Sequence, residues 1–146
     1  MTTAGEIMHA GATCIGERET LATAAQRMRE LGVGALPICG DDSRLHGMIT
    51  DRDIVVNCVA VGRNPATMSA SELAQGKVYH VDASAGVRQL LDVMEQHQVR
   101  RLPVIDDDHR IVGMVSEADI ARHLPEHEIA RFVKAICSQR AIASGG

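Results

Sequence analysis

Apolar residues recur at helical and strand-like spacings through the first half of the chain. Every third or fourth position of Leu21–Leu31 is apolar, which predicts an amphipathic helix. Thr20 precedes this stretch as an N-cap, and Gly32 follows it as a stop signal. Leu36–Cys39 and Leu45–Thr50 are short apolar runs separated by turn residues, so they predict a β-hairpin.

Two further segments complete a unit of three strands and two helices. Thr13–Ile15 is expected to be a short strand, and a second helix is expected from Asp51 to about Ala60. The second half of the chain shows the same order of elements. They are expected at Val78–Val81, Val87–His97, Leu102–Ile105, Ile111–Ser116 and Glu117–His123. The pattern predicts a mixed α/β fold of two βαββα units.

The two halves are copies of one another in sequence. At an offset of 66 residues and without a gap, Ala35–Ile38 falls on Arg101–Val104, and Gly47–Ile54 falls on Gly113–Ile120. Two copies are too few for a solenoid, so we expect two similar repeats around a pseudo-two-fold axis. The predicted boundaries are residues 3–60 and 70–124 for the repeats, 61–69 for a linker, and 125–146 for a C-terminal helix and tail.

The C-terminal segment has no counterpart in the first half. Ile129, Phe132, Val133 and Ile136 have the i, i+3, i+4, i+7 spacing of an amphipathic helix. This helix either packs on its own domain or forms a contact between subunits.

Composition narrows the classes of function. The 146 residues carry a net charge of −4 and include one Tyr, one Phe and no Trp. An acidic chain without aromatic platforms is a poor candidate for nucleic-acid binding. No apolar run approaches the roughly 20 residues of a membrane helix, and no secretory signal is visible. We therefore expect a cytoplasmic protein, although a stable disulfide would favour an extracellular pool.

One motif that could bind a ligand occurs twice. Gly47–Asp53 and Gly113–Asp119 each end a strand and begin a helix, and their glycines are expected to let a ligand approach the backbone. Thr50 and Ser116 are placed to donate to a phosphate, and Asp53 and Asp119 are placed to bind the two hydroxyls of a ribose. The alternative is structural, since Ser or Thr followed three residues later by an acid resembles a helix capping box.

These two motifs, with Ala35–Ile38 and Arg101–Val104, resemble a pair of cystathionine β-synthase (CBS) domains, also called a Bateman module. The resemblance covers roughly residues 3 to 124. It implies tandem βαββα repeats that form a homodimer, and clefts between repeats that bind AMP, ATP or another adenosyl ligand. In those clefts Asp53 and Asp119 would hold the ribose, and Thr50 and Ser116 would lie near phosphate.

A narrower likeness links the chain to stand-alone CBS proteins of stress and low-oxygen responses. It is carried by Ile38–Asp42, Thr50–Val55 and Glu117–His127. It implies a dimeric protein without enzymatic activity, and no catalytic motif such as a Walker loop or HExxH is present. We therefore expect either a sensor that binds an adenosyl ligand, or a scaffold that binds no nucleotide and acts on an unknown protein partner.

Cysteines and histidines suggest two further features. Cys14 and Cys39 fall on strands that are neighbours in a βαβ crossover, so they either form a disulfide or stay as buried thiols. His97 and His123 each end a predicted helix, where a histidine is either a solvent-exposed cap or a ligand of zinc. The absence of a CxxC pair excludes a zinc ribbon.

Overall fold

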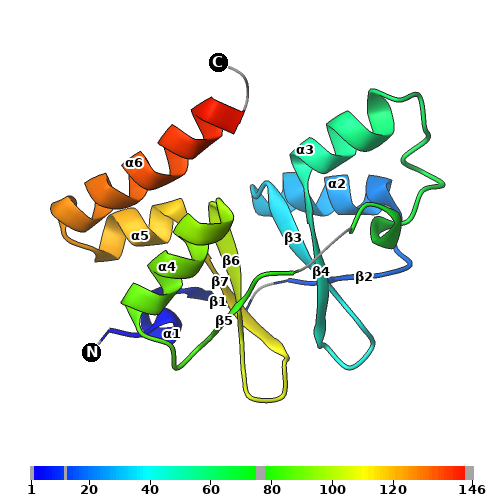
Figure 1. Ribbon diagram of the computed structural model, residues 1–146. Helices are drawn as coiled ribbons and strands as arrows, with labels where there is room; N and C mark the ends of the chain where they lie inside the picture. Colours follow the sequence, from blue (N-terminus) through cyan, green and yellow to red (C-terminus); the bar gives the residue numbers. More distant parts are fainter. Residues whose placement is uncertain (1, 12, 75–77, 144–146) are drawn as a thin grey trace. The chain divides into compact units, whose positions relative to one another are not determined.

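A computed structural model describes residues 2–11, 13–74 and 78–143 of the protein (Figure 1). Its contacts divide the chain into two compact units, which we name by their sheets. The three-stranded unit holds residues 12–78 and 108–111. The four-stranded unit holds residues 1–11, 79–107 and 112–146. The mixed α/β fold with two similar repeats is therefore confirmed.

The three-stranded unit contains a βαββ arrangement. Strand β2 (Ile15–Gly16) runs parallel to β3 (Ala35–Cys39), which pairs antiparallel with β4 (Leu45–Thr50). Helix α2 (Leu21–Leu31) connects β2 to β3. As predicted, the Thr20 hydroxyl caps this helix by accepting from the backbone N of Thr23 at 3.2 Å. Its core consists of Ile15, Leu21, Ala24, Met28, Leu36, Ile38, Ile49, Ile54, Cys58, Met68 and Ala70.

The helix expected from Asp51 to about Ala60 follows β4, and it consists of two kinds of helical turn. Helix α3 spans only Asp51–Ile54 and continues as a π-helical turn, η1 (Val55–Val59). The wide turn is seen in the bond from the backbone N of Ala60 to the oxygen of Val55, at 2.8 Å. Three β-branched valines in five residues crowd an α-helical turn, which weakens the local preference for it. Helix η2 (Ala70–Glu72) follows in the same unit.

The four-stranded unit combines the second repeat with the start of the chain. Its strand order is β1 (His9–Ala10), β7 (Ile111–Ser116), β6 (Arg101–Ile105) and β5 (Val81–Asp82). Strand β1 pairs antiparallel with β7, and β5 pairs parallel with β6. Helix α1 (Ala4–Ile7) precedes β1. The contacts thus group residues 1–11 with the second repeat, although most of them fall within the predicted bounds of the first one.

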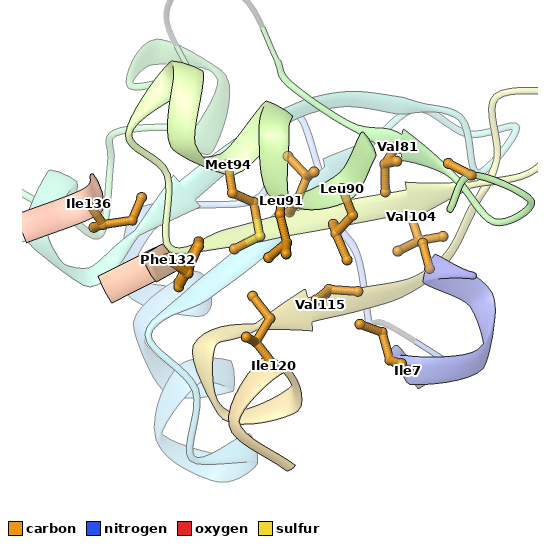
Figure 2. Packing of buried hydrophobic residues seen from close by; sticks show 13 residues of the cluster. Ile7, Val81, Leu90, Leu91, Met94, Val104, Val115, Ile120, Phe132 and Ile136 are labelled. Atoms are coloured by element: carbon orange, nitrogen blue, oxygen red, sulfur yellow. The ribbon is translucent and has the colours of Figure 1, made fainter. Parts of the chain in front are cut away.

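Three helices complete this unit: α4 (Val87–His97), α5 (Glu117–His123) and α6 (Glu126–Ala143). Figure 2 shows Phe132 and Ile136 of α6 within the same core cluster as Leu91 and Met94 of α4. Helix α6 therefore packs on its own unit, which was one of the two expectations for this segment. Among the helices that the structure describes, none is long and apolar enough to cross a bilayer.

Candidate ligand-binding site

The first motif copy forms a capping box at the start of α3. The Thr50 hydroxyl accepts from the backbone N of Asp53 at 3.1 Å. In return, Oδ2 of Asp53 accepts from the backbone N of Thr50 at 3.0 Å. The capping box, which was the structural alternative for this pair, is therefore present. It occupies one carboxylate oxygen of Asp53, and no hydrogen bond within the described part of the chain involves the other.

A pocket lies beside Asp53, within the three-stranded unit. Its volume is about 360 Å³, which falls in the range of sites for small organic ligands. The lining combines three apolar side chains with polar and charged ones: Met48, Asp53, Asn57, Arg63, Met68, Glu72 and Leu73. The sequence analysis identified Asp53 but missed the other members of this set.

Arg63 brings a positive charge to this pocket. Its Nη2 lies 3.5 Å from Oε1 of Glu72. The backbone of Arg63 is tied to the π-helical turn, since its N donates to Cys58 O at 2.9 Å and its O accepts from Cys58 Sγ at 3.5 Å. A guanidinium group has five N–H donors, so pairing with one carboxylate leaves donors for a ligand anion.

The second motif copy has a different environment. Asp119 is only 3% exposed. Its Oδ2 accepts from the backbone N of Ser116 at 2.8 Å and lies 3.1 Å from the Ser116 hydroxyl. The same oxygen lies 2.9 Å from Nδ1 of His9, on β1. Arg122 adds a longer contact, with its Nη2 3.5 Å from Oδ1. The roles predicted for Asp119 and Ser116 in ligand binding stay predictions.

The motif glycines accommodate segments of the chain itself. A Cβ added at Gly113 would lie 2.5 Å from Sδ of Met8 and 2.8 Å from O of His9. A Cβ added at Gly47 would lie 3.0 Å from Cβ of Ala74. The sequence analysis expected these glycines to let a ligand approach the backbone. In the structure, protein atoms occupy the space beside them.

The candidate zinc residues His97 and His123 both lie in the four-stranded unit. The ring of His97 stacks on Tyr79, with ring centroids 3.7 Å apart. Nδ1 of His123 lies 2.8 Å from the backbone O of Asp119. Across residues 2–11, 13–74 and 78–143 there is no group of three or more His, Cys, Asp or Glu side chains that could hold a metal. Zinc needs three or four ligands, so these residues of one chain do not form a complete site.

Cys14 and Cys39 form a disulfide, which was one of the two alternatives expected from the sequence. Their Cα atoms are 5.7 Å apart, and the bond joins the residue before β2 to the last residue of β3. Parallel pairing of Gly16 with Cys39 brings the two segments together. The free cysteines are Cys58, which is buried, and Cys137, which is exposed.

Comparisons with known proteins agree with this architecture. The sequence model of the CBS domain matches residues 4–59 and 70–126. Hypoxic response protein 1 of Mycobacterium tuberculosis (strain ATCC 25618 / H37Rv) is 65% identical over 144 residues, which cover 99% of this chain and 100% of that protein.

Two solved structures extend the comparison. The crystal structure of hypoxic response protein I with two coordinated zinc ions is 64% identical, with a TM-score of 0.79, and the match covers 85% of this chain and 100% of that one. The CBS pair of protein MJ0100, in complex with 5′-methylthioadenosine and S-adenosyl-L-methionine, is 24% identical with a TM-score of 0.73, over 84% of this chain and 94% of that one. The latter likeness concerns the fold alone. With two matched domain copies and a relative alike over almost its whole length, the chain belongs to the CBS-domain family.

Proposed function

We propose that the chain is a non-catalytic CBS-pair protein that senses an adenosyl ligand in the pocket beside Asp53 and serves a stress or low-oxygen response. The observation that carries the proposal is this pocket of about 360 Å³, whose lining combines a carboxylate, a guanidinium and apolar side chains. The MJ0100 pair, which shares the fold, is in complex with ligands of this class, 5′-methylthioadenosine and S-adenosyl-L-methionine. The 65% sequence identity to hypoxic response protein 1 supports a role in a stress or low-oxygen response.

Each lining residue suits one part of an adenosyl ligand. The oxygen of Asp53 outside the capping box can accept from the ribose hydroxyls, and charge-assisted bonds of this kind are the strong ones. The guanidinium of Arg63 can bind a phosphate. Met48, Met68 and Leu73 provide apolar contact for the adenine ring. Thr50 keeps its hydroxyl hydrogen, so its predicted phosphate contact is compatible with its cap.

The variant Asp53→Asn tests the proposal. Asn can still accept from the backbone N of Thr50 in the capping box, but it replaces a charged acceptor with a neutral one. Hydrogen bonds to charged groups contribute about 1.5–3 kcal/mol, so we expect the affinity for AMP to fall about 10- to 100-fold. Calorimetric titration of the untagged protein with AMP, ADP, ATP and S-adenosylmethionine measures this.

Asp51→Asn is the matched control for this titration. Asp51 is exposed, belongs to the same first turn of α3 and does not line the pocket. It should leave the affinity unchanged. Equal affinities of the wild type and Asp53→Asn would contradict the role of Asp53, and an absence of binding in the wild type would remove the sensor function.

A second candidate function is that of a scaffold that binds no nucleotide and acts through protein contacts, stabilised by the disulfide and by zinc. The zinc ions of the 64% identical protein favour it. So does His123, whose Nδ1 contact with the Asp119 carbonyl leaves Nε2 for a metal. His97 and His123 would supply two ligands of a zinc ion, with the others from outside this chain. Absence of nucleotide binding, together with equimolar zinc in untagged protein, would favour this alternative.

We also propose that the protein is a homodimer, because one segment of the three-stranded unit exposes valines. Val55, Val56, Val59 and Val61 are all exposed, and such a cluster is typical of an interaction surface. The double variant Val55→Lys/Val59→Lys places two charges on it, at positions 57% and 56% exposed. We expect the mass measured by light scattering to fall from two chains to one. The double variant Val55→Thr/Val59→Thr keeps the shape and should weaken the dimer less; a lysine variant that stays dimeric would place the interface elsewhere.

A further inference from the structure

The two motif aspartates differ in what engages them. Asp53 is half-buried and lines the pocket. Asp119 is almost fully buried, and both of its carboxylate oxygens have partners. Oδ2 interacts with Ser116 and with Nδ1 of His9, while Arg122 lies near Oδ1. His9 thus occupies one of the two oxygens with which Asp119 would hold the two hydroxyls of a ribose, so a ribose bound by both oxygens has to replace this contact.

The sequence itself makes this difference between the copies. At the offset of 66 residues, His9 falls on Gln75 and Arg122 falls on Val56. The two basic residues that contact the second aspartate therefore have no basic counterparts in the first copy. The two motif copies therefore share the residues that would bind a ligand, but only the second aspartate has basic side chains that would compete with a ligand for it.

His9 belongs to an N-terminal segment (residues 2–11) whose two ends are held differently. At one end Ala4 and Ile7 are buried in the core, and the backbone N of Ala4 donates to Ala85 O at 2.8 Å. At the other end β1 has two residues, both exposed, and pairs through His9 with Met114. Short exposed pairings open more easily than core elements. The end that carries His9 can therefore open while Ile7 stays in place.

We propose that His9 determines how many adenosyl ligands each chain binds. Its contact with Asp119 closes the second motif copy, so the ligand binds only at the Asp53 pocket, and displacement of His9 opens a second site of the same kind. This inference rests on the proposed function, since it assumes that both aspartates can bind a ribose. In this proposal His9 controls access to the site at Asp119 and does not itself bind the adenosyl ligand.

The test is the number of AMP molecules bound per chain, measured by calorimetry on the full-length untagged protein. The wild type should bind one. His9→Ala removes the ring and should bind two; the ring is 53% exposed, so its loss should leave the fold intact. His9→Ser, whose hydroxyl is too short to reach Asp119, should also bind two and provides a second variant if His9→Ala does not fold.

Two variants serve as controls. His9→Asn carries its amide nitrogen as many bonds from the backbone as Nδ1, so it should restore the contact and bind one AMP. His46→Ala removes another half-exposed histidine that contacts a carboxylate, that of Glu17, and should also bind one. In the His9→Ala background, Asp119→Asn should weaken AMP binding at the added site, and Asp53→Asn should weaken it at the original one, each about 10- to 100-fold.

The outcomes separate this inference from the proposed function. If the wild type binds two AMP molecules, or if the folded His9 variants bind one, His9 does not control a site. If the wild type binds none and His9→Ala binds one that Asp119→Asn weakens, the control by His9 holds while the Asp53 pocket is not the sensor site. If neither protein binds AMP, both are overturned.

Discussion

Loss of the Cys14–Cys39 disulfide is expected to lower the free energy of unfolding by about 3–4 kcal/mol. The bond closes a loop between residues 25 positions apart, and this closure restricts the unfolded chain more than the folded one. It also joins the residue before β2 to the end of β3, and the parallel pairing of these strands spans only two residues. Urea unfolding of the wild type and of the double variant Cys14→Ser/Cys39→Ser measures the difference.

Cys137→Ser is the control for this comparison, because Cys137 is exposed and free, and its replacement should leave the stability unchanged. A reductant should lower the stability of the wild type to that of the double variant and should not affect the double variant itself. Equal stability with and without reductant would show that the disulfide contributes nothing to the folded state.

Phe132→Ala is expected to have an effect of similar or larger size. Phe132 is 2% exposed and lies in the core of the four-stranded unit, where Figure 2 shows it beside Ile136 and near Leu91 and Met94. Removal of a buried phenyl ring costs about 3–5 kcal/mol, from lost apolar transfer and from the cavity left behind. Urea unfolding should show this loss, and hydrogen exchange should show faster opening of α6.

The neighbouring residue Val133 offers a matched control on the same helix. It is 48% exposed, so Val133→Ala should change the stability by no more than about 0.5 kcal/mol. Similar effects of the two variants would mean that α6 is not anchored by its buried face.

The elements with strong local signals were predictable from the sequence. The bounds of α4 and α5 and those of β4 and β7 agree with the prediction residue for residue. Apolar periodicity, cap residues and turn clusters all act within a few positions along the chain, and the internal repeat supplied each signal twice. The family followed from the same repeated motifs.

Features that depend on distant residues were not predictable in this way. The pairing of β1 with β7 joins residues more than 100 positions apart through two residues, and no local pattern marks it. The sequence analysis therefore left His9 unassigned, although it contacts Asp119. Arg63 was also missed, because a single basic residue in a predicted linker carries no signal until the fold brings it to the pocket.

The grouping of residues 1–11 with the second repeat has a consequence for the order of folding during synthesis. The apolar residues Ala4 and Ile7 leave the ribosome well before most of their packing partners, which lie between residues 81 and 136. At a synthesis rate of about 5–20 residues per second, these residues wait several seconds or longer for their core. The four-stranded unit can therefore complete its folding only after residue 136 has left the ribosome, when Ala4 and Ile7 can reach their partners.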